Sequence, residues 1–294
     1  MQLLDGKLVS QKTKDELKKQ TEALILDGKR PPHLAAVLVG NNGASETYVA
    51  NKVKSCKEVG FESTLIRLEE QITEAELIAV VKKLNEDNNI DGILVQLPLP
   101  KQIDEFKIIN TISPDKDVDG FHPVNTGKML LADERAFLPA TPFGILLLLE
   151  HYNITTKGKR VVVVGRSNIV GRPISILMSQ QRKFGDATVT LCHSKTNNLK
   201  EITCQADILI SAIGSPGMIG LDMVKDGAIV IDVGIVRVND DTTKLGYKIK
   251  GDVNFEDVAS KCSFITPVPG GVGPMTIAAL MINTMQAYKQ SFTK

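Results

Sequence analysis

The sequence has 294 residues, of which 43% are hydrophobic and 23% are charged, and this composition is typical of a globular protein. Its length favours two domains of ordinary size. The formal net charge of +1 gives no reason to expect nucleic acid or an anionic membrane as a partner, and no apolar run approaches the length that spans a bilayer.

The N-terminal residues and the cysteines both predict a cytoplasmic location. Residues 1–5 lack the charged and apolar layout of a secretory signal. The four cysteines are scattered, without a C-x-x-C pair, which is typical of reduced core cysteines in an intracellular protein. None of the four histidines stands at metal-ligand spacing, so we predict no metal site.

Strand and helix patterns alternate along the first half of the chain, which predicts a parallel α/β layer. Thr73, followed three residues later by Glu76, predicts a helix that begins with a capping box. Segment 121–139 shows little periodicity. The predicted helices cover residues 8–27, 44–58, 73–85 and 104–109, and the predicted strands cover 34–39, 63–68 and 93–97.

A second α/β series begins near residue 160. Between the two series, Thr141-Pro142 begins an apolar helix that we expect to join two domains. Segment 239–250 is polar and predicts a hairpin or excursion. The predicted strands are 161–164, 187–192, 207–211, 228–233 and 264–266, and the predicted helices are 173–183 and 274–291.

We therefore predict an α/β protein with two α/β domains that flank a cleft, the second a Rossmann-like doubly wound parallel sheet. The first domain is expected over residues 1–138, joined by the C-terminal helix 275–294. The second is expected over residues 139–274.

The helix predicted at 44–58 carries an unusual polar stripe. Tyr48 and Lys52 are four residues apart and share one face, with Ser45 and Ser55 nearby on it. A lysine on a helix is most often a solvated surface group. The alternative is that the stripe forms a catalytic wall.

A glycine-bearing loop, residues 165–171, follows the buried strand at 161–164 and precedes a helix. In this context backbone N–H groups at a helix N-terminus hold a pyrophosphate. Ser167 and Val170 stand where the strict G-x-G-x-x-G pattern has glycines, so the motif taken alone is weak. An ordinary strand-to-helix turn is the alternative.

The end of the next strand reads Cys192-His193-Ser194-Lys195-Thr196 and contains no acid. A site for NAD usually has Asp or Glu there, whereas Arg166, Ser194 and Lys195 would suit a 2′-phosphate. The pattern favours NADP over NAD, and an exposed basic turn is the alternative. Two later strands end in glycines, at 212–214 and 232–235, which fits close backbone approach of a cofactor.

Three further segments admit both a structural and a functional interpretation. Gln96 lies at the carboxyl end of the predicted strand 93–97 and is either a satisfied core amide or a site residue. The acidic loop through Asp119 is either a solvated turn or a binding loop. The stiff segment 267–274, rich in proline and glycine, is either an interdomain connector or a wall against a flat ligand.

Over nearly its whole length, the chain resembles bifunctional methylenetetrahydrofolate dehydrogenase / methenyltetrahydrofolate cyclohydrolases of the FolD type. The resemblance rests on six ordered motifs. They are Tyr48-Val-x-x-Lys52, Gln96-Leu-Pro-x-Pro, Pro114-Asp-Lys-Asp-Val-Asp119-Gly, Ala140-Thr-Pro-x-Gly144, Val164-Gly-Arg-Ser-x-x-Val-Gly171 and Pro267-Val-Pro-Gly-Gly-Val-Gly-Pro-Met-Thr276.

The resemblance implies NADP-dependent oxidation of 5,10-methylenetetrahydrofolate and hydrolysis of the methenyl product to 10-formyltetrahydrofolate. Lys52 would assist the water, Gln96 would position its amine, Tyr48 would pack on the folate and Asp119 would bind the pterin edge. A homodimer that pairs through the second domain is also implied. The implied cofactor contacts are Gly165, Arg166, Ser167, Gly171, Ser194 and Ile235, and the implied substrate contacts are Tyr48, Asp119, Pro269, Gly270, Gly271 and Thr276.

Two other functions stay open. A monofunctional dehydrogenase of the same fold would lack the hydrolytic step. A non-catalytic dinucleotide-sensing module would use the Asp119 loop and segment 267–274 only as scaffold.

Overall fold

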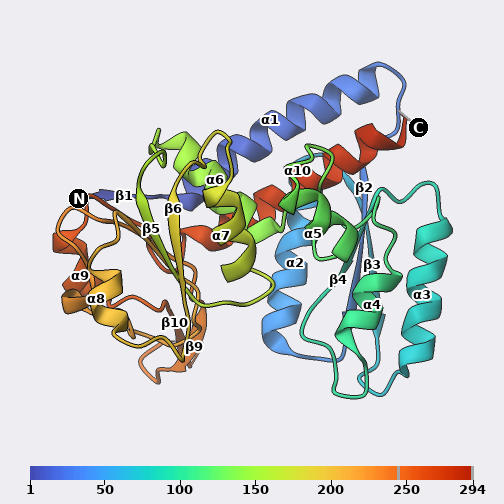
Figure 1. Cartoon of the computed structure of the whole chain (residues 1–294). Helices are drawn as coiled ribbons and strands as arrows, with labels where there is room; N and C mark the ends of the chain where they lie inside the picture. The colour runs from blue at the N-terminus through green and yellow to red at the C-terminus, as the bar shows by residue number, and fades with distance from the viewer. Residues whose placement is uncertain (244–245, 293–294) are drawn as a thin grey trace. The chain divides into compact units, whose positions relative to one another are not determined.

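The structure is a computed structural model that describes residues 1–243 and 246–292 (Figure 1). The chain divides into two compact units. We call residues 1–10 and 141–276 the six-stranded unit, and residues 11–140 and 277–294 the three-stranded unit, after their main sheets. The division falls inside the first helix, α1 (Gly6–Leu26), and the last, α10 (Val272–Ser291).

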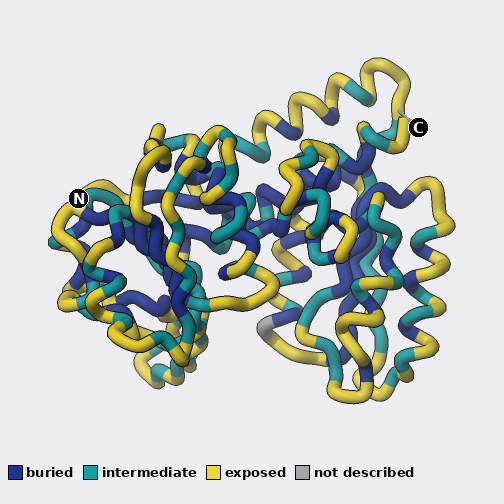
Figure 2. Tube along the Cα trace, in the orientation of Figure 1, coloured by how far each residue is buried: buried dark blue, intermediate teal, exposed yellow. Residues whose placement is uncertain are grey.

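The three-stranded unit has a parallel sheet of order β3-β2-β4. The strands are β2 (His33–Val39), β3 (Glu62–Leu68) and β4 (Gly92–Val95). The central strand β2 is almost entirely buried and is mostly dark blue in Figure 2. The edge strand β3 is partly exposed and is teal and yellow there. This difference explains why β2 reads as a continuous apolar run and β3 does not.

Helices surround this sheet and complete its core. Leu77, Val81 and Leu84 of α3 lie in one buried cluster with residues of β2 and β4. Thr73 caps α3 and forms the predicted capping box with Glu76. Besides α1 and α10, the helices are α2 (Gly43–Glu58), α3 (Glu74–Glu86), α4 (Glu105–Thr111) and α5 (Pro123–Leu130).

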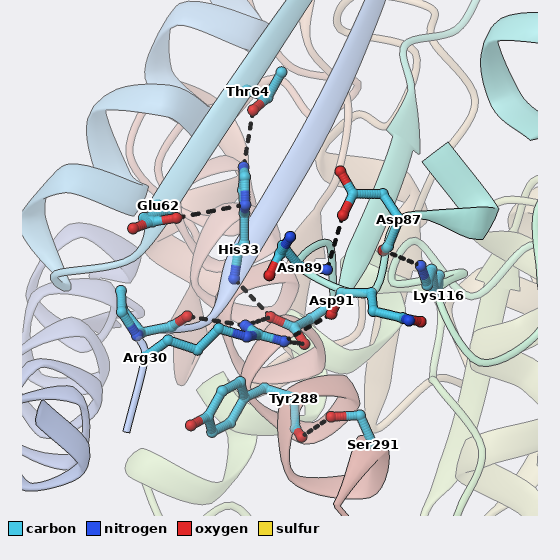
Figure 3. A network of polar contacts seen from close by, with 12 residues as sticks. Arg30, His33, Glu62, Thr64, Asp87, Asn89, Asp91, Lys116, Tyr288 and Ser291 are labelled. Carbon is cyan, nitrogen blue, oxygen red and sulfur yellow. Dashed lines mark hydrogen bonds and ion pairs between the residues drawn. The ribbon is translucent and has the colours of Figure 1, made fainter. Parts of the chain in front are cut away.

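The C-terminal helix α10 is fixed to the three-stranded unit by a polar network (Figure 3). The guanidinium of Arg30 makes two hydrogen bonds to the carboxylate of Asp91, at 2.7 and 2.8 Å, and lies 5.1 Å from the ring centroid of Tyr288. Asp91 also accepts the backbone N–H of His33 at 2.8 Å. One charged pair thus connects the start of β2, the start of β4 and the buried Tyr288 of α10.

The six-stranded unit has a parallel sheet of order β1-β11-β8-β7-β5-β6. The chain runs outward from β5 to β6 and then returns to the other side of β5 as β7. This reversal at β5 is the switch point at which doubly wound sheets bind their ligands. The strands are β1 (Gln2–Leu3), β5 (Arg160–Val164), β6 (Thr188–Cys192), β7 (Ile208–Ser211), β8 (Ile229–Asp232) and β11 (Phe264–Ile265).

Short helices and one hairpin accompany this sheet. The predicted hairpin is confirmed, but it begins before the predicted segment 239–250: its strands are β9 (Val236–Asn239) and β10 (Tyr247–Lys250). Its residues 244–245 lie outside the described part of the chain. The helices are α6 (Ala140–His151), α7 (Gly171–Ser179), α8 (Leu199–Thr203), η1 (Leu221–Met223), α9 (Phe255–Val258) and η2 (Ala259–Lys261).

The predicted α/β class with a Rossmann-like second sheet is confirmed. Helix α5 is a finding that the sequence pattern did not predict. His122 caps it and Pro123 occupies its first turn, but one of its two buried residues is the polar Asn125, so no apolar periodicity is visible. Several element bounds also differ by a few residues. The helix predicted at 173–183 is α7 at Gly171–Ser179, and the strand predicted at 93–97 is β4, which ends at Val95, so that Gln96 follows the strand.

Strand β1 was not predicted either. It pairs with β11, and residues 1–10 therefore group with the six-stranded unit. The predicted domain bounds concern ligand binding and stay a prediction. Residues 1–138 with 275–294 are expected to bind folate, and residues 139–274 are expected to bind NADP. Among the described helices, none is both long and apolar enough to cross a membrane.

Candidate active site

Lys52 is a buried lysine in the middle of α2. Only 5% of its surface is exposed, whereas its neighbour Lys54 points to solvent. Ser45 and Ser55 are also buried, so the polar stripe of α2 faces inward. The interpretation of Lys52 as a solvated surface group is therefore wrong for this chain.

Gln96 supplies the hydrogen-bond partner of that lysine. The Nζ atom of Lys52 donates to Oε1 of Gln96 at 3.1 Å. The Nε2 atom of Gln96 donates to the carbonyl of Leu97 at 2.7 Å, and its backbone N–H donates to the carbonyl of Val37. Both ends of the amide are therefore fixed, and its oxygen faces the amine.

Tyr48 and Asp119 complete this cluster. The Nζ atom of Lys52 lies 5.2 Å from the ring centroid of Tyr48, one helical turn earlier. Burial lowers the pKa of Lys52, and the nearby charge of Asp119 opposes that shift. Burial likewise raises the pKa of Asp119, and the charge of Lys52 opposes it. The sequence-predicted set Tyr48, Lys52, Gln96 and Asp119 thus comes together within one unit.

Asp119 belongs to a loop that hydrogen bonds hold at several points. Its neighbour Asp117 is buried and accepts the N–H groups of Phe121 and His122 and the side-chain amide of Asn125. Burial raises the pKa of Asp117 to about 7, although these three hydrogen bonds favour its charged form. No donor in the described part of the chain hydrogen-bonds the Asp119 carboxylate itself.

The arrangement has the features of a site for general base chemistry. An amine with a lowered pKa can be neutral near neutral pH, and a neutral amine accepts a proton from water. A carboxylate without protein donors is ready to accept N–H groups from a ligand. The ring of Tyr48 supplies an apolar surface beside them.

In the six-stranded unit, the glycine loop joins β5 to α7 by close backbone packing. A Cβ atom at Gly165 would lie 2.1 Å from the carbonyl oxygen of Ala212, and one at Gly171 would lie 1.8 Å from that of Gly165. The hydroxyl of Ser167 accepts the N–H groups of Val170 and Gly171, at 3.1 and 3.4 Å. The glycines therefore have the packing roles that a dinucleotide loop requires, despite the serine in place of the second glycine.

The loop after β6 lies directly beside it. The N–H of Gly165 donates to the carbonyl of Cys192 at 2.9 Å, and hydrogen bonds from His193 to Thr196 close a turn. This turn leaves Ser194 and Lys195 exposed, and Arg166 is exposed in the adjacent loop. The donors predicted for a 2′-phosphate therefore stand at the C-terminal ends of paired strands, and no acid stands in the 193–196 turn.

Two buried aspartates support this end of the sheet, and the sequence pattern did not single them out. Asp252 accepts the N–H groups of Ile213 and Ser215 and the hydroxyl of Ser211. Asp232 accepts the N–H groups of Gly234, Asp252 and Val253, and burial raises its pKa to about 6. Asp232 ends strand β8 and Asp252 lies in a loop, and a single aspartate in either place gives no sequence signal of this role.

Segment 267–271 is a tight turn held by the N-terminus of α1. The N–H of Lys7 donates to the carbonyl of Gly270 at 3.1 Å, and Gly271 donates to Pro267 at 2.8 Å. Gly270 has φ of +113°, which favours glycine. The hydroxyl of Thr276 lies 3.1 Å from that of Thr141. Half-exposed Ile235 lies near Gly273, and the contacts predicted for these residues with ligands stay predictions.

Known protein families and structures match both units. The model for the tetrahydrofolate dehydrogenase/cyclohydrolase catalytic domain matches residues 4–119, and the one for the NAD(P)-binding domain matches residues 139–292. The bifunctional protein FolD of Flavobacterium johnsoniae is 61% identical over 294 residues, covering 100% of this chain and 99% of the relative. The chain belongs to the tetrahydrofolate dehydrogenase/cyclohydrolase family.

Solved structures of this family have the same fold. The bifunctional FolD of Campylobacter jejuni is 49% identical, with a TM-score of 0.92 and 99% coverage of each chain. The FolD of Trypanosoma brucei, solved with NADP cofactor and an inhibitor, is 36% identical, with a TM-score of 0.94 and coverage of 99% of this chain and 98% of that one. The close backbone packing at Gly165 and Gly171 agrees with this family, whose second domain model is described as NAD(P)-binding.

Proposed function

We propose that this chain oxidises 5,10-methylenetetrahydrofolate with NADP and then hydrolyses the 5,10-methenyl product to 10-formyltetrahydrofolate. The observation that carries the proposal is the buried amine of Lys52, held by Gln96 beside Tyr48 and Asp119. The family membership and the glycine loop support the oxidative step. NADP, when bound, supplies the acceptor for the hydride of the one-carbon bridge.

In the proposed oxidation, the protein binds and orients its two ligands. Gly165, Ser167 and Gly171 would let the pyrophosphate approach the backbone at the start of α7. Arg166 and Ser194 would hold the 2′-phosphate. The carboxylate of Asp119 would pair with the adjacent N–H donors of the pterin ring, since a carboxylate matches such a pair of donors.

In the proposed hydrolysis, Lys52 acts on water. The methenyl product carries an amidinium-like cation, which a protonated lysine would repel. Burial lowers the pKa of Lys52, and the cationic ligand would lower it further, which favours the neutral amine. The neutral amine would take a proton from water as the oxygen attacks the one-carbon centre, and Gln96 would keep that amine in place. In the adduct, the bond from the carbon to N5 would then break, N5 would take up a proton as the hydroxyl loses one, and the carbon would stay on N10 as the formyl group. The proton taken by Lys52 would be released to solvent.

The decisive experiment compares two lysines of α2. The purified protein and the variants Lys52→Met and Lys54→Met are assayed for methylenetetrahydrofolate oxidation and for methenyl hydrolysis, with NADP and with NAD. Lys52→Met should abolish hydrolysis. Exposed Lys54→Met should leave it unchanged, because its side chain is 75% exposed.

The outcomes also separate the rival functions. Unchanged hydrolysis in Lys52→Met would make the lysine assignment wrong. A wild-type protein that oxidises but does not hydrolyse would be a monofunctional dehydrogenase. A protein without folate-dependent reduction of NADP would support the sensing module.

We also propose the finer features implied by the resemblance. The wall of Pro269, Gly270, Gly271 and Thr276 would contact folate, and Ile235 would contact the cofactor. The protein would act in the cytoplasm as a homodimer. Light scattering of the purified protein would test the dimer, and a monomer across the micromolar range would contradict it.

A further inference from the structure

We infer that Asn283, in the middle of α10, is a positioning residue that sets the place of Asp119 for folate. The inference rests on the proposed role of Asp119 in binding the pterin. Asn283 is far from Asp119 in sequence, and none of the six motifs contains it. Its side chain is 1% exposed, within the three-stranded unit.

The amide of Asn283 donates both of its hydrogens to the loop region. Its Nδ2 atom lies 2.8 Å from the carbonyl oxygen of Val118 and 2.9 Å from that of Leu138. The carbonyl of Val118 belongs to the peptide bond that leads into Asp119. Asn283 therefore restrains the backbone directly before the proposed pterin ligand.

The second carbonyl belongs to a segment that supports the same loop from the other side of Asp119. Gly120 lies against this segment so closely that a Cβ atom would be 2.6 Å from the carbonyl carbon of Leu138. Gly120 also has φ of +72°, which favours glycine. One amide thus holds Val118 and Leu138 together, and Asp119 stands between Val118 and the glycine that packs on Leu138.

The number of N–H donors in the side chain explains why an asparagine is needed here. Only a primary amide of this size offers two donors to two carbonyls. The Oδ1 atom of Asn283 is buried and accepts no hydrogen bond from the described residues. A buried polar atom without a partner is unfavourable, so the two donated bonds are what the residue contributes.

Asp117 completes the restraint from within the loop. Its carboxylate holds the N–H groups of Phe121 and His122, which follow Asp119. Asp119 is thus bracketed by Asn283 on its N-terminal side and by Asp117 on its C-terminal side. These contacts restrain the backbone, and none of the described residues donates a hydrogen bond to the Asp119 carboxylate.

The test measures the KM for 5,10-methylenetetrahydrofolate, the KM for NADP and kcat in three variants. Asn283→Leu removes both donors at similar volume, and Asn283→Ser keeps one donor and is the milder change. The control is Thr284→Val, a buried neighbour whose hydroxyl, among the described residues, hydrogen-bonds only the carbonyl of Leu280 in its own helix. We expect the folate KM to rise about tenfold in Asn283→Leu and less in Asn283→Ser, as the loss of two hydrogen bonds and then one would give.

The KM for NADP should change less than twofold in these variants, and Thr284→Val should resemble the wild type. An equal loss of kcat and of both affinities would indicate a general structural role and would overturn the inference. If Asn283→Leu does not fold, Asn283→Ser carries the same comparison. An unchanged folate KM in the folded variants would overturn the inference as well.

A double-mutant cycle with Asp119→Ala separates this inference from the function on which it rests. If Asn283 acts through Asp119, Asn283→Leu should raise the folate KM no further in the Asp119→Ala background. Full additivity would overturn the positioning role while leaving the pterin role of Asp119 in place. An unchanged folate KM in Asp119→Ala alone would instead contradict the proposed function, and the inference with it.

Discussion

The amine of Lys52 and the amide oxygen of Gln96 lie 3.1 Å apart, although 44 residues separate them in the chain. The other end of the amide donates to the carbonyl of Leu97, so the oxygen must accept from the amine. A neutral amine that donates one hydrogen in this way keeps its lone pair for another partner. In the proposed hydrolysis, that partner is the attacking water.

The rate of methenyl hydrolysis should therefore depend on the ionisation of Lys52. Burial lowers the pKa of this amine from its ordinary value of 10.5, so the neutral form is populated at lower pH than in a free lysine. The enzymatic rate should rise with pH through that lowered pKa. Subtracting the uncatalysed reaction from a pH profile isolates this contribution. A flat profile for the wild type would contradict a role for the neutral amine.

Replacing Gln96 with glutamate should move that profile. Gln96→Glu would place a carboxylate beside the amine, which would raise the pKa of Lys52 and keep it protonated. We expect slower hydrolysis at neutral pH and partial recovery at higher pH. Gln102→Glu makes the same chemical change on an exposed loop and is the control. A slower rate with an unshifted pH profile would mean that Gln96 positions the amine of Lys52 without affecting its pKa.

Much of the fold could be predicted from sequence because local patterns agreed with tertiary placement. The capping box at Thr73 and the apolar runs of β2 and β5 depend on short stretches of chain, and the structure has them where the patterns indicated. Helix α5 was missed because a buried asparagine occupies its core-facing side. Strand β1 was missed because two residues carry no periodicity, and its partner β11 is at the far end of the sequence.

The identity of the candidate site residues could be predicted from the sequence, but their burial and their hydrogen-bond partners could not. The Tyr48–Lys52 spacing placed both residues on one face of a helix, yet the burial of Lys52 depends on segments far away in sequence. The hydrogen bonds of Asp117, Asp232 and Asn283 could not be predicted for the same reason: each partner is chosen by the packed structure. Polar residues that hold loops in place have no spacing rule of their own.

An acidic residue in the turn after β6 should reverse the cofactor preference. Ser194→Asp would put a negative charge where we propose that the 2′-phosphate of NADP binds, so the KM for NADP should rise about tenfold or more, equivalent to at least roughly 1.4 kcal/mol. The KM for NAD should change little, because NAD lacks that phosphate. The control is Asn197→Asp, just beyond the closed turn. An equal loss for both cofactors would place the 2′-phosphate elsewhere.

Removing the carboxylate of Asp91 should destabilise the three-stranded unit. Asp91→Ala would break two hydrogen bonds to Arg30 and one to the N–H of His33, with a loss of about 2–3 kcal/mol in the free energy of unfolding. Urea denaturation measures this change. The control is Asp27→Ala, because the pair of Asp27 with Lys29 is exposed and should contribute less than about 1 kcal/mol. A loss no larger than the control would contradict the role of the network in Figure 3.

The division of the chain inside α10 has a consequence for the order of events during synthesis. Residues 141–276 leave the ribosome before the second half of α10, so the six-stranded unit has its whole sheet while the three-stranded unit still lacks residues 277–294. Until that helix docks, Tyr288 cannot pack beside Arg30, and the carbonyls of Val118 and Leu138 lack the amide of Asn283. The nascent chain should therefore acquire dinucleotide affinity before folate affinity. A ribosome-stalled chain ending near residue 276 would lack an ordered Asp119 loop.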